Sequence, residues 1–152
     1  MSFYDSLNIS ASGLTAQALR MDVISNNIAN AQTTRTATGG PYRREMVVLT
    51  PATTSSSFAG MLNQSMQQGS SATSGFNGAG VQVAGIVQDP SPFQVVYDPS
   101  SPDAVNGYVQ MPNVDIGTEM VDMISASRAY EANVTAFNSS KQMDQDALNL
   151  GK

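Results

Sequence analysis

The side chains with the most potential for chemistry lie in the run Ser139, Ser140 and Lys141, the only place where a serine adjoins a lysine. The 152-residue chain contains no Cys and no His, so a nucleophilic hydroxyl would need Lys141, Lys152 or a carboxylate of raised pKa as its base. The run falls in a segment of helical periodicity, where consecutive side chains point apart. We therefore predict no catalytic residue and no enzymatic activity.

Two further patterns only superficially suggest ligand sites. Asp98 and Asp103 are carboxylates separated by prolines, but the spacing of a calcium-binding EF-hand loop is absent. Gly75, Gly78 and Gly80 lack the preceding strand and the following helix of a phosphate-binding loop. Because thiolate and imidazole ligands are also missing, we expect no metal site and no cofactor.

Charge is sparse in this sequence. Charged residues make up 12% of the chain, against about 25% in typical soluble domains, which favours a subunit whose faces are covered by neighbours. The net charge of -5 argues against nucleic acid as a partner. Residues 1–9 lack the features of a secretory signal peptide, and no run of about 18 apolar residues is present, so we expect no membrane-spanning segment.

The N-terminal part has the periodicity of one long amphipathic helix, from Tyr4 to Ile28 and ending near Asn30. Apolar residues recur every seven positions, at Leu7, Leu14, Met21 and Ile28. Between them runs a second series of mostly small residues, which would let a partner helix approach closely: Tyr4, Ala11, Ala18 and Ser25. At about 1.5 Å per residue, such a helix reaches roughly 40 Å, more than a globule of this size would cover.

Three features of this helix allow two interpretations each. The apolar series is either a core stripe within one subunit or a seam between subunits, and we favour the seam because of the helix length and the sparse charge. Asn26, Asn27 and Asn30 either end the helix or form amide hydrogen bonds across a subunit contact. Gly13 is either tolerated within the helix or required there by a close backbone contact.

Between Pro41 and Pro112 the periodicity changes to that of short strands. Runs of β-branched and aromatic residues predict a small antiparallel sheet with strands at residues 42–49, 81–87, 93–97 and 108–111. Residues 53–80 carry no charge and are rich in Ser, Gly, Gln and Thr, which indicates a long flexible insert. We expect a middle domain at residues 37–114, between helical segments at residues 1–36 and 115–152.

Helical periodicity returns from about Thr118, the expected N-cap, to Leu150. Its stripe advances in steps of four and three: Ile116, Met120, Met123, Ser127, Tyr130, Val134 and Phe137. Arg128 and Glu131 are three residues apart, so they form either a surface ion pair or part of a partner contact. The expected fold is α+β: long N- and C-terminal helices form a coiled-coil-like core, and the small antiparallel β-rich domain lies between them in sequence.

Several segments resemble the family of flagellar rod and hook axial proteins. The N-terminal runs SASGLTA (residues 10–16) and MDVISNNIAN (residues 21–30) resemble the signature that rod and hook proteins share. EMVDMISASRAYEANVTA (residues 119–136) is similar to the C-terminal helix of the proximal-rod branch almost residue for residue. Shorter segments also resemble that branch: GPYRR (40–44), GVQV (80–83), DPSP (89–92), VYDP (96–99), GYV (107–109) and MPNV (111–114). The chain departs from the family pattern in its charge-free insert and at residues 115–118, where a Pro- and Glu-containing helix start is usual.

The resemblance implies a structural subunit of the bacterial flagellar basal body, whose terminal helices form the core of the rod and transmit torque. It implies export by the flagellar type III apparatus and a place in the periplasmic space. The implied partners are copies of the chain, the rod proteins FlgB, FlgF and FlgG and the rod-base adaptor FliE, with a rod-cap muramidase as a further candidate. It also favours a partner contact for Arg128 and Tyr130.

We therefore expect the subunit interface on both helices, at Leu7, Ala11, Leu14, Ala18, Met21, Ser25, Asn26, Asn27, Ile28, Asn30, Met120, Met123, Ser127, Arg128, Tyr130, Glu131, Val134 and Phe137. The alternative is another type III-exported or secreted interaction protein, adhesin-like and without catalytic activity. Its helices would pair stably within a monomer, whereas those of a rod subunit would stay labile until assembly.

Overall fold

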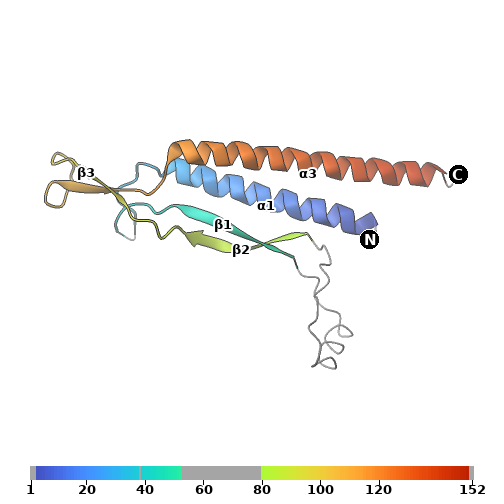
Figure 1. Cartoon of the computed structure of the whole chain (residues 1–152), viewed down its shortest axis with the longest axis horizontal. Helices are drawn as coiled ribbons and strands as arrows, with labels where there is room; N and C mark the ends of the chain where they lie inside the picture. The colour runs from blue at the N-terminus through green and yellow to red at the C-terminus, as the bar shows by residue number, and fades with distance from the viewer. Residues whose placement is uncertain (1–2, 38, 53–79, 151–152) are drawn as a thin grey trace, which may run out of the picture.

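The structure is a computed structural model that describes residues 3–37, 39–52 and 80–150. Two long helices, α1 (Phe3–Ala29) and α3 (Ile116–Leu150), run side by side in opposite directions (Figure 1). Four strands of the described residues lie between them in sequence, so the α+β fold with long terminal helices is confirmed. Of the insert expected at residues 53–80, only Gly80 falls within the described residues.

The strands form two separate antiparallel hairpins. β1 (Glu45–Pro51) pairs with β2 (Val81–Gln88), with a bulge between Val48 and Leu49. β3 (Gln94–Tyr97) pairs with β4 (Tyr108–Met111). The expectation of one sheet is therefore wrong. The connection from β2 to β3 contains Pro90 and Pro92, which cannot donate ladder hydrogen bonds and so do not extend the first hairpin.

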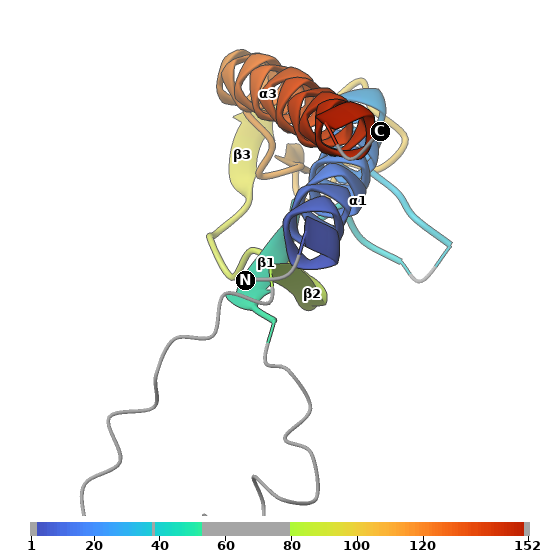
Figure 2. The same ribbon diagram turned by 90° about the vertical axis from the view of Figure 1, so that its right-hand side faces the viewer.

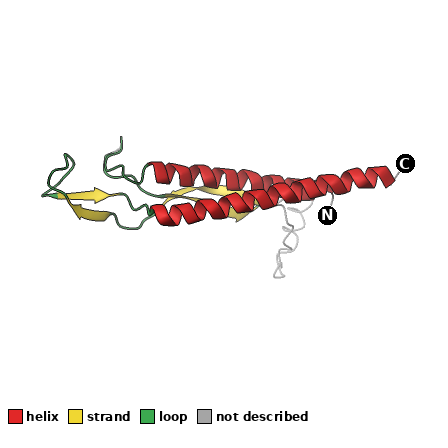
Figure 3. Ribbon diagram, turned by 90° about the horizontal axis from the view of Figure 1, so that it is seen from above, coloured by secondary structure: helices red, strands yellow, loops and turns green. Residues whose placement is uncertain are grey.

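The elements stack in three layers, with α1 between α3 and the β1–β2 hairpin, as the end-on view shows (Figure 2). The small apolar core includes Ala16, Val23 and Ile24 of α1 and Ala126 of α3, which are all buried. The β3–β4 hairpin extends beyond the helices at the end opposite the two chain termini (Figure 3). No helix among the described residues is both long enough and apolar enough to cross a membrane.

The start of α3 differs from the expectation that Thr118 is the N-cap. Asp115 takes this role, because its Oδ1 accepts a hydrogen bond from the Gly117 amide at 3.0 Å. Thr118 lies in the first turn and donates its hydroxyl to Asp115 Oδ2 at 2.8 Å. The Thr118 hydroxyl and then the Gly117 amide stabilise the carboxylate and lower the pKa of Asp115. A short acidic side chain one residue before the helix therefore caps α3.

Gly13 marks a close approach of the two helices. A Cβ atom at this position would lie 2.9 Å from Asn133 Nδ2 of α3, closer than side-chain contacts normally come. Of the two interpretations left open by the sequence, the structure supports a close contact, which the Gly13 backbone makes with the Asn133 side chain and not with the backbone of α3. The helices therefore pack within one chain, and they do so at a position where α1 has no side chain.

Candidate functional site

A group of polar residues joins α1, α3 and the start of β1, and we call it the helix-end network: Arg20, Asn27, Tyr42, Arg44, Glu119 and Asp122. Its centre is Asn27, which is 1% exposed. Asn27 Nδ2 donates to Glu119 Oε2 at 3.1 Å and to the Glu45 carbonyl at 2.8 Å. Asn27 Oδ1 accepts from Tyr42 Oη and from the Glu45 amide, both at 3.0 Å. The amide thus uses two donors and two acceptor positions to fix α1 against β1 and α3.

Arg44 supplies the charged half of this network. Its Nε donates to Oε1 of Glu119, whose side chain is 1% exposed. Its second terminal nitrogen lies 3.2 Å from Asp122 Oδ2, and Asp122 Oδ1 lies 3.5 Å from Arg20 of α1. A buried carboxylate without a partner would be costly, so the guanidinium is what allows Glu119 to remain inside the fold.

The same surroundings act on Tyr42. Burial raises the pKa of its phenol, and the nearby carboxylates of Glu45 and Glu119 raise it further. Tyr42 is therefore a neutral hydrogen-bond donor to Asn27 at physiological pH. The helix-end network holds three elements in place, and its polar atoms are occupied with one another.

Within the described part of the chain, the residues considered for catalysis or metal binding do not form a site. Ser140 is buried, whereas Ser139 and Lys141 are exposed, and no hydrogen bond joins them in the part of the chain that the structure describes. Asp103 accepts from the Thr34 hydroxyl at 3.0 Å and lies 3.6 Å from Arg35, while Asp98 accepts from the Ser100 amide. Within residues 3–37, 39–52 and 80–150 no cluster of three or more His, Cys, Asp and Glu side chains is placed to hold a metal ion.

The interface residues expected from the sequence separate into three groups by burial. One residue, Asn27, is buried and offers no surface to a neighbour, so its assignment to the interface is corrected. The exposed members are Ala11, Ser25, Asn26, Met120, Arg128 and Glu131. The half-buried members are Leu7, Leu14, Ala18, Met21, Ile28, Asn30, Met123, Ser127, Tyr130, Val134 and Phe137.

The half-buried state of the apolar series follows from helix geometry. Gly13, Arg20 and Asn27 face α3, through Asn133, Asp122 and Glu119 respectively. Leu14, Met21 and Ile28 each come one residue later, which places them about 100° around the helix, at the flank of the contact. The pairing of α1 with α3 within the chain thus leaves this series partly open.

Asn30 takes part in ending α1. Its Nδ2 donates to the Asn26 carbonyl at 3.0 Å and to Asn26 Oδ1 at 2.8 Å, and its Oδ1 accepts from the Thr33 hydroxyl at 3.2 Å. These bonds satisfy groups at the end of the helix, where backbone partners run out. They favour the helix-ending interpretation for Asn26 and Asn30.

The outer side of α3 carries a group of exposed apolar side chains that the sequence pattern did not predict. Met120, Val121 and Ile124 are 55%, 67% and 56% exposed. Among the helices and strands in the part of the chain that the structure describes, α3 packs against α1 alone, so no other helix or strand of that part covers these side chains. The sequence contained a signal for this surface, because apolar residues stand on both sides of Asp122. A helix that packs on one side needs a single apolar face, so apolar residues outside that face indicate a second one.

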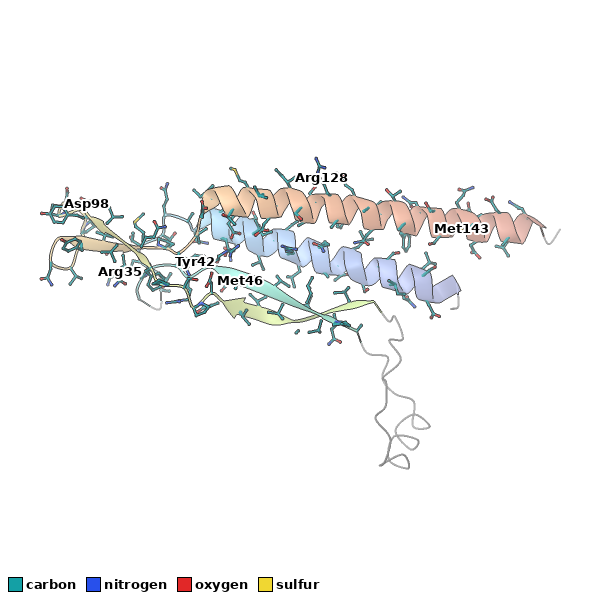
Figure 4. All side chains as sticks on the ribbon, viewed as in Figure 1. Arg35, Tyr42, Met46, Asp98, Arg128 and Met143 are labelled. Carbon is teal, nitrogen blue, oxygen red and sulfur yellow. The ribbon has the colours of Figure 1, made fainter. Side chains whose placement is uncertain are left out.

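Arg128 also lies on the outer side of α3, where it projects away from α1 (Figure 4). No carboxylate of the described residues lies within 4.0 Å of its guanidinium, so the surface ion pair with Glu131 is not formed. Arg128 is therefore available for a partner, whereas Tyr130 is half-buried.

Comparisons with known proteins point in one direction. Residues 7–35 match the family described as flagella basal body rod protein, and residues 105–150 match the C-terminal family of flagellar basal body rod FlgEFG proteins. The flagellar basal-body rod protein FlgC of Bacillus subtilis (strain 168) is 50% identical over 157 residues, with both chains covered completely. FlgC of Borreliella burgdorferi is 48% identical over 154 residues, covering 97% of each chain. FlgC of Salmonella typhimurium is 36% identical over 153 residues, again with complete coverage of both.

Proposed function

The chain belongs to the FlgC family of flagellar basal-body rod proteins, and we propose that it builds the rod by polymerising through α1 and α3. It is a structural subunit of the flagellar basal body and assembles with other flagellar rod proteins. The adhesin-like alternative is not favoured, because full-length relatives are rod proteins.

The observation that carries the proposed mode of assembly is the uncovered outer side of α3. Met120, Val121 and Ile124 expose more than half of their surface in the single chain. Contiguous apolar side chains of this kind mark interaction surfaces in soluble proteins. Burial of such groups against a neighbour contributes roughly 25 cal/mol for each Å² removed from water.

The finer features of this function are part of the proposal. Torque passes through packed helices and no bond is made or broken, so the subunit acts without catalysis. The polymerising core comprises residues 1–36 and 115–152, and residues 37–114 form the domain outside it. The chain leaves the cytoplasm by the flagellar type III apparatus and lies in the periplasmic space. Its neighbours are further copies, FlgB, FlgF, FlgG and FliE, and a rod-cap muramidase acts during growth of the rod.

A paired substitution tests assembly through the helices. Met120→Asp combined with Ile124→Asp places two charges on the outer side of α3 without touching the helix-end network. We expect this variant to be exported normally but to be lost from isolated basal bodies, with swimming abolished, because burying unpaired carboxylates in a subunit contact is unfavourable. Immunoblots of basal bodies and of the exported fraction give both quantities.

The matched control keeps the same positions apolar, with Met120→Leu and Ile124→Leu, and should retain swimming. If the charged variant enters basal bodies as efficiently as the unaltered chain, α3 is not an assembly surface.

A further inference from the structure

The outer faces of α1 and α3 carry matching stripes. The α1 stripe consists of Ala11, Thr15, Ala18, Asp22, Ser25 and Ala29. The α3 stripe consists of Val121, Ser125, Arg128, Ala132, Thr135 and Ser139. Both advance in alternating steps of four and three residues, as one face of a helix does. All twelve side chains are exposed except that of Ala18, which is half-buried.

These stripes lie on the sides of the helices that face away from the contact within the chain. Ala11, Ala18 and Ser25 each come two residues before Gly13, Arg20 and Asn27, which face α3. Val121 and Thr135 likewise come two residues after Glu119 and Asn133, which face α1. Two residues turn a helix by about 200°. One chain therefore cannot bring its own two stripes together.

The charges on the two stripes are complementary. Asp22 is the one charged residue of the α1 stripe and Arg128 the one charged residue of the α3 stripe. Neither lies within ion-pair distance of an opposite charge in the part of the chain that the structure describes. Arg20, by contrast, pairs with Asp122 on the inner side of the same helices.

The register of the two charges is also the same. When the α1 stripe is followed from its N-terminal end and the α3 stripe from its C-terminal end, Asp22 and Arg128 each occupy the fourth position. The antiparallel pairs are then Ala11 with Ser139, Thr15 with Thr135, Ala18 with Ala132, Asp22 with Arg128, Ser25 with Ser125 and Ala29 with Val121.

The remaining side chains suit a close contact. They are small, so two helix backbones can approach to about 8 Å. The hydroxyl of Thr15 donates to the Ala11 carbonyl at 3.1 Å and that of Thr135 to the Glu131 carbonyl at 2.9 Å. Both threonines thus have a hydrogen-bond partner on their own helix and can enter a contact without an unsatisfied donor.

We propose that the α1 stripe of one copy docks antiparallel onto the α3 stripe of a second copy, with Asp22 and Arg128 paired at the centre. The proposal rests on the proposed function, since it specifies which faces meet when the chain polymerises. Because two different surfaces meet, the contact repeats from copy to copy and forms a ring or an open helical row instead of a closed dimer.

A charge exchange tests the pairing in cells. Asp22→Arg and Arg128→Asp should each reduce the amount of chain in isolated basal bodies by about tenfold or more, because like charges then meet in the contact. The double variant restores the opposite pair and should return incorporation to near the original amount. Circular dichroism of each purified single variant should match the original, since both side chains are exposed. Single variants that assemble normally, or a double variant no better than either single one, would overturn the pairing.

Cross-linking tests whether the α1 stripe contacts a second copy of this chain. The chain has no Cys, so Ala18→Cys combined with Ala132→Cys introduces a single pair at matching positions. Oxidation of intact basal bodies should give a ladder of dimers and higher multiples of this chain. Ala11→Cys with Ala132→Cys uses the same stripes about two turns out of register and should give little product.

A disulfide to a different rod protein, or equal yields from the two pairs, would contradict the proposed contact. Different results would contradict the proposed function. They are the absence of the unaltered chain from basal bodies, or normal assembly of the variant with charges at Met120 and Ile124.

Discussion

Asn27 illustrates how a polar side chain can look like a contact in the sequence and serve the fold instead. Its amide accepts from the backbone of Glu45 and donates to Glu119, and both partners are distant in the chain. A buried amide with all its hydrogen-bonding positions satisfied rigidifies a structure, whereas a partly satisfied one weakens it. The helix-end network therefore sets the angle at which the outer faces of α1 and α3 are presented.

Glu119 is the residue at which the network is most sensitive. We expect Glu119→Gln to lower the free energy of unfolding by about 3 kcal/mol, because Arg44 would lose its buried carboxylate partner. Urea denaturation of the purified chain measures this change. Glu131→Gln removes a carboxylate from an exposed position of the same helix and should change stability by less than about 0.5 kcal/mol. Similar effects of the two substitutions would mean that the network does not hold the elements together.

At the scale of elements, the packing of the β1–β2 hairpin against α1 depends on Gly80. This residue has a φ of 96°. The backbone amide of the next residue, Val81, donates a hydrogen bond to the Ser12 hydroxyl at 3.1 Å. A Cβ atom at Gly80 would lie 2.3 Å from Ser12 Oγ and 3.3 Å from Ile9 Cα. The left-handed backbone and the close helix both require glycine.

Gly80→Ala should therefore lower the free energy of unfolding by about 1–3 kcal/mol, because the hairpin must move away from α1. Gly85→Ala is the matched control within β2, since no atom beyond the adjacent residues of the chain would lie within 4 Å of its Cβ atom. Thermal unfolding of both variants provides the comparison. An alanine at Gly80 as well tolerated as one at Gly85 would show that the hairpin does not depend on this close approach.

The sequence predicted the elements better than their contacts. The bounds of α1 and of β4 were predicted to within one residue, because a sustained helical period and a short β-branched run between turn residues are local signals. The N-cap at Asp115 was missed because Thr118 is also a good capping residue. The helix-end network could not be predicted, since it joins Asn27, Arg44 and Glu119, whose proximity arises only when the chain folds.

At the scale of the whole molecule, the ion pairs of the helix-end network lie on the inner sides of the described helices, and the charges of the two stripes lie on their outer sides. Arg20 and Arg44 pair with carboxylates where the layers meet, whereas Asp22 and Arg128 lie on the outer faces. The single chain thus has a small interior in which apolar side chains lie beside a connected polar network, and its outer surfaces are suited to neighbours. This division matches a subunit that is held together at one end of its helix pair and completed by assembly.

The β3–β4 hairpin adds a second exposed region at the far end of the molecule. Val95 and Tyr97 are 59% and 66% exposed, and the ring of Tyr97 packs edge-on against Tyr108 at 5.3 Å. Because this hairpin lies beyond the helices, contacts made there would be separate from those along α1 and α3 (Figure 1).

A density map of the isolated basal body tests assembly through the terminal helices most directly. We predict that this chain lies in the rod with the outer faces of α1 and α3 buried between neighbouring subunits. A map in which the chain is absent from the rod, or in which its subunits meet through the hairpins while both outer helix faces stay open to solvent, would contradict this.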